Sequence, residues 1–221
     1  MNISLLPVSA PFSVEDFRAR ARGRLSPELA PDALDPAFAP ARGDYVLNAP
    51  EPEPHVVARA RPAAVLAPIV ARPEAPTVLL TLRASKLRAH SGQIAFPGGK
   101  IDEGETALAA ALREAQEEIG LEPRFVEPLG WLDPYLTGTG YRIMPLVAVV
   151  DPAFTLTINP HEVEDVFEAP LSFLMDGANH QRQSREWQGK LRHFYAMPYG
   201  ERYIWGATAG ILRNLYERLY S

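Results

Sequence analysis

Short apolar runs of strand length recur along the chain from residue 62 onward. AAVLAPIV (63–70) and TVLLTLR (77–83) are separated by a proline-containing turn, and SGQIAFPGG (91–99) ends on Pro-Gly-Gly, which stops a strand. We expect one strand from each run. The same reasoning predicts further strands over 125–132, 141–150 and 193–198. A sheet therefore begins after residue 62.

One helix stands out between residues 106 and 120. Thr106 can cap it, Gly120 can end it, and the ALAAALREAQEEI between them is rich in strong helix formers. Its apolar side chains share one face, which we expect to pack onto the sheet: Leu108, Ala111, Leu112, Ala115 and Ile119. A terminal amphipathic helix is predicted over 207–219.

The first part of the chain has a different residue pattern. Ser13 followed by Asp16 resembles a helix cap, which predicts a short helix over 14–22. Nine of the 22 prolines fall within the first 54 residues, and 27–54 shows neither a helical nor an alternating pattern. We therefore divide the chain into an N-terminal helix with a proline-rich arm, 1–58, and a catalytic domain, 59–221.

Composition narrows the function classes. The chain has 221 residues, 47% of them hydrophobic, and no apolar run near the length of about 20 residues that crosses a bilayer. The start lacks the features of a secretory signal, so we expect a cytoplasmic protein that does not bind membranes. Cysteine is absent, which excludes disulfides and thiolate metal sites. The net charge of -5 disfavours nucleic acid as a partner.

Three carboxylates lie beside the apolar face of the central helix. Glu114, Glu117 and Glu118 fall within two turns, where like charges repel one another unless a cation neutralises them. Carboxylate oxygens without thiolates favour Mg²⁺ or Mn²⁺, and Mg²⁺ is usually held together with water and phosphate oxygens. The helix is therefore a candidate metal site that docks phosphate. Taken alone, the helix favours the other interpretation, an ordinary solvated acidic face.

The residues around these glutamates favour the metal site over the solvated acidic face. The segment GKIDEGETALAAALREAQEEIGL, which starts at Gly99, resembles the Nudix box, with Ala115 at the aliphatic position as its mildest departure. The other matching positions are Gly99, Glu105, Arg113, Glu114, Glu117, Glu118, Gly120 and Leu121. The resemblance implies an α/β fold of Nudix type, an α/β/α sandwich with a mixed β-sheet and a loop-helix-loop motif. It also implies that the three glutamates are metal ligands and that Arg113 orients the site through Glu105.

A second signature precedes the box. LLTLRASKLRAHSGQIAFPGG (79–99) resembles the additional signature of the coenzyme A diphosphatase branch of Nudix hydrolases, which cleave coenzyme A and its thioesters to 3',5'-ADP and 4'-phosphopantetheine or its acyl form. Its candidate substrate-binding residues are Arg83, Lys86, Arg88, His90, Gly98 and Gly99. The four cationic candidates could receive the phosphates of coenzyme A. The alternative is a solvated loop.

The resemblance continues more loosely to about residue 215. Glu162 and Asp165 lie where Nudix enzymes often recruit a further carboxylate, and we rank Glu162 first. The general base would be Glu162 or one of the three box glutamates, and the sequence leaves this choice open. Four aromatic side chains could stack on an adenine or could belong to the core: Phe194, Tyr195, Tyr199 and Trp205.

The predicted function is thus hydrolysis of the diphosphate of coenzyme A or a derivative, with Mg²⁺ or Mn²⁺ as cofactor. One alternative is a Nudix diphosphatase for another nucleotide: ADP-ribose, NADH, a dinucleoside polyphosphate or an oxidised nucleotide. An alternative from another class is a non-catalytic module that binds a nucleotide as a sensor. The expected partner is a small nucleotide-like molecule, and a homodimer stays open.

Overall fold

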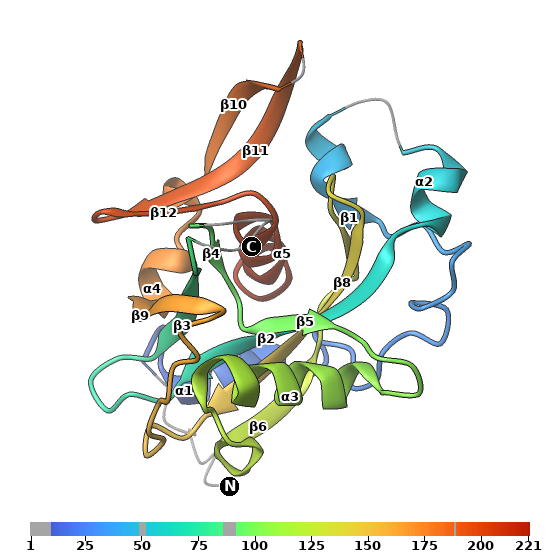
Figure 1. The fold of residues 1–221 in the computed structure, drawn as a ribbon. Coiled ribbons are helices and arrows are strands. Elements are labelled where there is room, and N and C mark those ends of the chain that lie inside the picture. Colours follow the sequence, from blue (N-terminus) through green and yellow to red (C-terminus); the bar gives the residue numbers. More distant parts are fainter. Residues whose placement is uncertain (1–9, 49–51, 86–91, 188) are drawn as a thin grey trace, which may run out of the picture.

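The computed structural model describes residues 10–48, 52–85, 92–187 and 189–221 (Figure 1). Among these residues, nine strands form one mixed sheet: β1 (Arg42–Gly43), β2 (Arg61–Val70), β3 (Thr77–Arg83), β4 (Ile94–Ala95), β5 (Gly98–Lys100), β6 (Val126–Trp131), β7 (Tyr135–Leu136), β8 (Tyr141–Val150) and β9 (Val163–Pro170). A second sheet has the strands β10 (Gln181–Trp187), β11 (Lys190–Tyr199) and β12 (Arg202–Trp205). The helices are α1 (Val14–Ala21), α2 (Pro54–Ala58), α3 (Ala107–Ile119), α4 (Leu171–Leu174) and α5 (Ala207–Leu219), with 3-10 turns η1 (Asp44–Leu47), η2 (Pro123–Phe125) and η3 (Gly177–Asn179).

The centre of the larger sheet is a parallel pair of strands, β2 and β8. They are in register from Arg61 opposite Tyr141 to Val70 opposite Val150. β3 runs antiparallel to β2, and β6 and β7 run antiparallel to β8, so the sheet is mixed. Both central strands are almost wholly buried, which explains why their sequences are continuous apolar runs. The strands predicted at these positions are confirmed.

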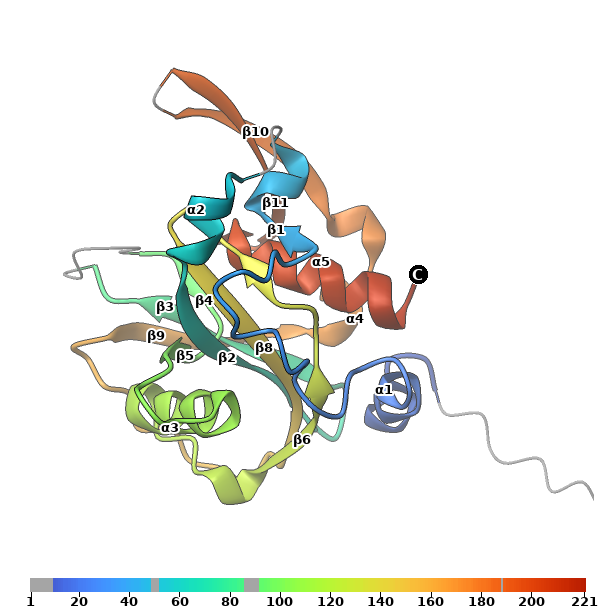
Figure 2. The ribbon, with the colours of Figure 1, turned by 90° about the vertical axis from the view of Figure 1, so that its right-hand side faces the viewer.

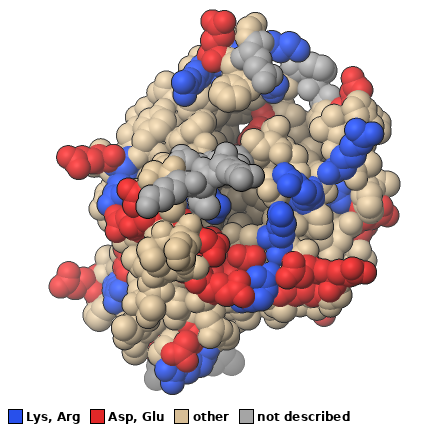
Figure 3. Space-filling model, in the orientation of Figure 1, with Lys and Arg blue, Asp and Glu red and all other residues tan. Residues whose placement is uncertain are grey.

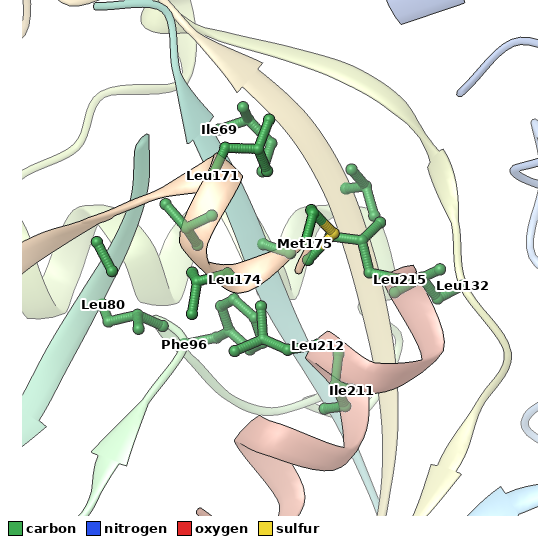
Figure 4. Close-up of a cluster of buried hydrophobic side chains, with 14 of the residues drawn as sticks. Ile69, Leu80, Phe96, Leu132, Leu171, Leu174, Met175, Ile211, Leu212 and Leu215 are labelled. Atoms are coloured by element: carbon green, nitrogen blue, oxygen red, sulfur yellow. The ribbon is translucent and has the colours of Figure 1, made fainter. Parts of the chain in front are cut away.

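Helices cover both faces of the sheet (Figure 2). On one face, Ala64 and Leu66 of β2 pack with the alanines of α3 in one buried cluster. On the other face, Ile69 of β2 packs with Ile211 and Leu215 of α5 in a second cluster (Figure 4). Successive residues of β2 point to opposite faces, as the two-residue period of a strand requires. The three-layer α/β/α arrangement expected from the sequence is confirmed.

The bounds of α3 agree with the prediction, and Ala111, Ala115 and Ile119 of its predicted apolar face are buried, but Leu108 is not. The hydroxyl of Thr106 accepts a hydrogen bond of 3.1 Å from the amide nitrogen of Ala109, and Gly120 ends the helix at a φ of 72°. Leu108, predicted to be buried, is 41% exposed. Alanines and Glu118 lie against the sheet instead. Because alanine is small, the helix backbone approaches the sheet closely and brings its acidic side chains with it.

The single strand predicted over 91–99 is wrong. The segment forms two short strands: β4 pairs with β3, and β5 pairs with β2. The chain changes strand partner between them, at Phe96 and Pro97. Pro97 has no N–H to donate to a sheet, but its carbonyl oxygen accepts a hydrogen bond of 2.8 Å from the amide nitrogen of Leu66. This crossing directs the start of β5 toward α3.

The N-terminal arm packs into the same core as the rest of the chain. Phe17 of α1 is fully buried among side chains of the sheet and α5. β1 adds a parallel strand beside β7. The guanidinium of Arg142, which is 2% exposed, donates to the carbonyl oxygens of Ala33, Asp35 and Pro36 in the arm and of Val57 in α2. The arm is therefore fixed to the sheet through buried contacts.

The C-terminal strands project and then return to the body. The strand predicted over 193–198 lies within β11, which pairs with β10 in a hairpin that extends away from the core (Figure 1). β12 leads back to the sheet, and α5 follows at Ala207, as predicted. Within the described residues, no helix is both long and apolar enough to cross a membrane.

Candidate active site

A cavity of about 380 Å³ opens between the sheet, α3 and the start of α5. Apart from three glutamates, its lining residues come from seven parts of the chain: Asp44; Ala63 and Val65; Arg83; Gln93 to Phe96; Gly98 to Lys100; Thr137, Thr139, Tyr141 and Ile143; and Trp205 to Thr208 with Ile211. Three glutamates, Glu114, Glu118 and Glu162, complete the lining. In Figure 3, acidic side chains gather over α3, below the hollow in this face of the molecule.

The three cavity glutamates form one cluster. Glu114 and Glu118 are one helical turn apart on α3, so both point to the same side of the helix. Glu162 comes from the segment between β8 and β9, and the amide of Asn159 donates to its Oε1 over 3.0 Å. One carboxylate oxygen from each glutamate lies within 4.8 Å of the other two. The spacing and the purely oxygen donor set fit a hard divalent cation such as Mg²⁺ or Mn²⁺.

The electrostatics of the cluster also fit a cation. Glu118 is 2% exposed, and its burial raises the pKa of its carboxyl to about 7, although the amide of Gly98 and the charge of Arg83 favour ionisation. Burial also raises the pKa of Glu114, against the effect of Arg113. The negative charges of Glu114 and Glu162 also raise the pKa of Glu118. Binding a divalent cation would relieve this cost.

Glu117 is placed differently from the other two box glutamates. It is 55% exposed, and its Oε2 accepts a hydrogen bond of 3.0 Å from Nη1 of Arg113. It is not among the residues gathered in the carboxylate cluster, where Glu162 stands with Glu114 and Glu118. Sequence spacing identified the helical face correctly, but it could not tell which glutamates point into the cavity.

Arg113 connects the loop before α3 to the helix. Its Nε and Nη2 each lie 2.9 Å from a carboxylate oxygen of Glu105, which is the forked pair expected from the box. This pairing lowers the pKa of Glu105 and raises that of Arg113. Nη1 of Arg113 also donates to Glu114 over 3.0 Å, and Nη2 donates to the carbonyl oxygen of Lys100 over 3.1 Å. Arg113 thus holds both the loop and one cavity carboxylate in position.

The two glycines of β5 contact the carboxylates directly. The amide nitrogen of Gly98 lies 3.1 Å from Oε2 of Glu118, to which it donates. A side chain at Gly98, whose φ is 152°, would overlap with the backbone of β2. A Cβ at Gly99 would overlap with the carboxyl group of Glu114. Both glycines line the cavity, and their lack of side chains lets the carboxylates approach β5.

Of the four cationic candidates upstream of the box, Arg83 belongs to the described residues. Arg83 lines the cavity, with Nη1 3.5 Å from Oε1 of Glu118, and its Nε is buried without an acceptor among the described residues. Lys86, Arg88 and His90 lie outside the described residues. Asp165, the second candidate carboxylate after the box, is not part of the carboxylate cluster. Its Oδ2 forms an ion pair with Nη2 of Arg202 at 2.5 Å.

Of the four candidate aromatic residues, Trp205 lines the cavity. Phe194 contacts Trp205 edge-to-face at 5.3 Å, and Tyr199 packs against Phe173 at 5.0 Å. Several other lining residues are not predicted from the sequence, including Asp44 in the arm, Tyr141 at the start of β8 and Thr208 in α5. Their spacing along the chain carries no signal that would have grouped them, because the fold alone brings them together.

Comparisons with known proteins point to one family. The profile of the NUDIX domain family, described as "NUDIX domain", matches residues 60–188. The chain is 42% identical over 156 residues to the "Uncharacterized Nudix hydrolase NudL" of Escherichia coli O7:K1, covering 70% of this chain and 81% of that protein. It is 38% identical over 176 residues to the protein of the same name from Photorhabdus laumondii, covering 79% of this chain and 94% of that protein.

The similarity to solved structures is more distant. An Ap4A hydrolase from C. elegans, in a binary complex, is 19% identical with a TM-score of 0.44, covering 50% of this chain and 80% of that chain. DR0079 from Deinococcus radiodurans is 15% identical with a TM-score of 0.47, covering 73% of this chain and 83% of that chain. Likenesses this distant carry no argument about substrate.

Proposed function

Because the chain belongs to the NUDIX domain family and is a Nudix hydrolase acting on phosphorus anhydrides, we propose that it hydrolyses the diphosphate of coenzyme A or a derivative. The products would be 3',5'-ADP and 4'-phosphopantetheine or its acyl form. The main structural support for hydrolase activity is the cluster of Glu114, Glu118 and Glu162 in the wall of an open cavity. The choice of coenzyme A rests on the signature over 79–99.

The position of that signature in the fold supports its role in substrate binding. Arg83 from its first half lies beside the buried carboxyl of Glu118. Ile94, Ala95 and Phe96 from its second half line the cavity next to the carboxylate cluster. The same segment that narrows the family to coenzyme A therefore borders the proposed reaction centre.

In the proposed reaction, a water oxygen attacks one phosphorus of the diphosphate and the bond to the bridging oxygen breaks, so that a phosphomonoester leaves. Mg²⁺ or Mn²⁺ bound at the cluster would supply charge neutralisation and a water of lowered pKa. Glu114, Glu118 and Glu162 would hold the cation, and one cavity carboxylate would accept the proton of the water. Arg113 and Gly98 would keep these carboxylates in place. Arg83 would face the developing phosphate charge.

A substrate panel tests this proposal. The purified chain would be assayed with coenzyme A, ADP-ribose, NADH and diadenosine tetraphosphate at equal Mn²⁺ concentration, and the products identified by mass. We expect the highest kcat/KM for coenzyme A or an acyl derivative. A higher kcat/KM for ADP-ribose, NADH or diadenosine tetraphosphate would sink the coenzyme A assignment while leaving the hydrolase intact.

A second arm of the experiment separates an enzyme from a nucleotide-binding sensor. Glu118→Gln keeps the size of the side chain and removes its charge, so turnover should fall by orders of magnitude. Chelation of divalent ions should abolish product formation by the unaltered chain. Binding of coenzyme A with no product at any metal concentration would favour the sensor.

A further inference from the structure

The projecting hairpin continues directly from the cavity wall (Figure 1). Trp205, the last residue of β12, lines the cavity and lies opposite Ala196 of β11 in the sheet register. Directly opposite residues of an antiparallel pair share a face, and the side chains of one strand alternate between faces. Phe194, two residues from Ala196, is therefore on the same face, and its ring contacts that of Trp205 edge-to-face at 5.3 Å. One face of the hairpin thus begins at the cavity.

The two faces of the hairpin differ in charge. The face that begins at Trp205 continues through Phe194 to three cations, Arg185, Lys190 and Arg192, and we call it the cationic face. The one acidic residue within the described bounds of β10 and β11 is Glu186, which is on the other face, opposite Leu191. The cationic face therefore combines aromatic rings near the cavity with positive charge further out.

Arg185 and Arg192 are directly opposite each other in the register of β10 and β11. Like charges at such a position destabilise a sheet, because their side chains are held close together. Both residues are exposed, and among the residues that the structure describes neither guanidinium forms an ion pair. The chain as a whole is acidic, with a net charge of -5. An anion bound by both guanidinium groups would replace this repulsion with two attractions.

The arginine pair stands beyond the rim of the cavity, within reach of a ligand that Trp205 holds. Arg192 is four residues from Ala196 along β11, which corresponds to about 13 Å between their Cα atoms. The long side chain of an arginine spans part of this gap. The indole of Trp205 has two flat faces, and the edge-to-face contact of Phe194 covers one of them at most. A ring stacked on Trp205 and a phosphate at the arginines can therefore belong to one molecule.

We propose that the cationic face of the hairpin binds the nucleotide half of the substrate, with the adenine stacked on Trp205 and the 3'-phosphate bound by Arg185 and Arg192. This inference rests on the proposed function, since it fixes the direction in which a coenzyme A-like diphosphate lies. The diphosphate is at the carboxylate cluster, which lines the same cavity as Trp205. The 3'-phosphate is recognised outside the cavity and is not cleaved.

The two halves of coenzyme A differ in the chemistry that the hairpin would recognise. The nucleotide half has a purine, which stacks on an indole, and a phosphomonoester, which an arginine fork binds through two oxygens. The pantetheine half has neither an aromatic ring nor a charge. If it lay along the hairpin, the two arginines would keep their mutual repulsion and Trp205 would gain no stacking partner. The cationic face thus favours the nucleotide half.

Calorimetric titration of the full chain in Mg²⁺ with 3',5'-ADP and with 5'-AMP tests the phosphate contact, because the two nucleotides differ by the 3'-phosphate alone. Arg185→Gln and Arg192→Gln should each raise the Kd of 3',5'-ADP about fivefold and leave the Kd of 5'-AMP unchanged. Arg182→Gln is the matched control, since Arg182 is an exposed arginine of the same strand on the other face. An equal change in both Kd values, or an equal effect of Arg182→Gln, would overturn the contact.

Substitution of Trp205 tests the stacking. Trp205→Leu should raise the Kd of both nucleotides about tenfold, because both carry the adenine. Trp205→Phe keeps an aromatic face and should restore most of this affinity, and a melting curve of each variant would verify that the fold is kept. If Trp205→Phe bound both nucleotides as weakly as Trp205→Leu, or if Trp205→Leu bound them normally, the stacking role would be wrong.

These readouts separate the inference from the proposed function, since binding of 3',5'-ADP requires no hydrolysis. If the unaltered chain hydrolyses coenzyme A but binds 3',5'-ADP and 5'-AMP with equal Kd, the inference fails alone. If the chain hydrolyses no coenzyme A, the proposed function fails, and the titrations still decide whether the hairpin binds a nucleoside 3',5'-bisphosphate.

Discussion

The amide nitrogen of Gly98 donates a hydrogen bond of 3.1 Å to Oε2 of Glu118, joining the first residue of β5 to the last turn of α3. The bond favours the ionised carboxylate, yet burial outweighs it and the pKa of Glu118 rises to about 7. The chain therefore keeps a carboxyl group in a position where, without a cation, its charge is unfavourable. Perturbed pKa values of this kind are common in active sites, and the stability that the protein loses by them can be measured.

The metal-free protein should lose stability as the pH rises toward neutrality. The pKa of Glu118 is higher in the folded chain than its ordinary value of 4.5, so the folded state binds this proton more tightly. The resulting stabilisation is fully present below pH 4.5 and is lost as the pH rises to about 7, a change on the order of 3 kcal/mol. Glu118→Gln should remove this pH dependence, so in chelator the variant melts progressively higher than the unaltered chain between pH 5 and pH 8.

The control for this measurement is Glu117→Gln, on the same helix but 55% exposed. If the unaltered chain and Glu118→Gln had parallel melting temperatures across the pH range, the buried carboxyl would not be the source of the effect. Activity provides the complementary readout. Glu118→Gln should be more stable without metal and nearly inactive with it.

Divalent ions should stabilise the chain more strongly at high pH. A cation binds the ionised carboxylates, and protons compete for Glu118 below its pKa of about 7. At a Mn²⁺ concentration about 100 times the dissociation constant, the gain in unfolding free energy would be roughly 3 kcal/mol. We expect a larger rise in melting temperature with Mn²⁺ at pH 8 than at pH 5.5, measured by thermal denaturation and by calorimetric titration.

Glu162 and Asp165 give a matched pair for the same experiment. Both lie beyond the box, but only Glu162 joins the carboxylate cluster, whereas Asp165 pairs with Arg202. Glu162→Gln should weaken Mn²⁺ binding about tenfold or more. Asp165→Asn should leave the Mn²⁺ titration as it is in the unaltered chain. Equal effects of the two substitutions would remove Glu162 from the proposed metal site.

The sequence predicts the local elements well because local signals define them. Thr106 and Gly120 determine the ends of α3 through a side-chain cap and a positive φ, and both operate over a few residues. The strand over 91–99 fails for the opposite reason. Its two halves pair with different strands, β3 and β2, and a change of partner leaves no periodic trace in the sequence. Leu108 is misassigned because the rotation of the helix is set by how closely alanines can pack.

The candidate site divides in the same way. Glu114 and Glu118 follow from the spacing of a single helix. Glu162 joins them from 44 positions further along the chain, and only the resemblance to the family suggested it. Asp44 carried no signal, because it lies in a proline-rich stretch whose packing depends on contacts with residues 135–138. Functional residues that lie on one helix can thus be inferred from the sequence. The residues of a cavity formed by many elements cannot.

Gly99→Ala should impair catalysis with little loss of fold. A Cβ at this position would overlap with the carboxyl group of Glu114, which must then move away from the cluster. β5 itself can accept an alanine, because the overlap is with the end of a side chain that can rotate. We expect Mn²⁺ affinity and kcat to fall by about tenfold or more while the melting temperature changes by only a few degrees.

Gly104→Ala is the comparison for this substitution. Gly104 lies in the loop before α3, and an added Cβ there meets nothing within 4 Å, although its φ of 79° makes an alanine strained. It should therefore lower stability without displacing Glu114. If Gly99→Ala retained normal Mn²⁺ affinity, the close contact between β5 and the proposed metal-binding carboxylates would not be needed for metal binding.

Arg142→Met should release the arm and, with it, the part of the cavity wall that Asp44 provides. Burial lowers the pKa of Arg142, and its guanidinium is matched by backbone carbonyls of the arm and α2, so the substitution leaves buried acceptors without donors. We expect a loss of roughly 2–4 kcal/mol in urea unfolding. We also expect faster proteolytic cleavage within 30–48 and a higher KM for coenzyme A, because Asp44 is carried by this segment. Arg59→Met, at the exposed end of α2, is the control. Cleavage and KM matching those of the control would mean that Arg142 does not hold the arm.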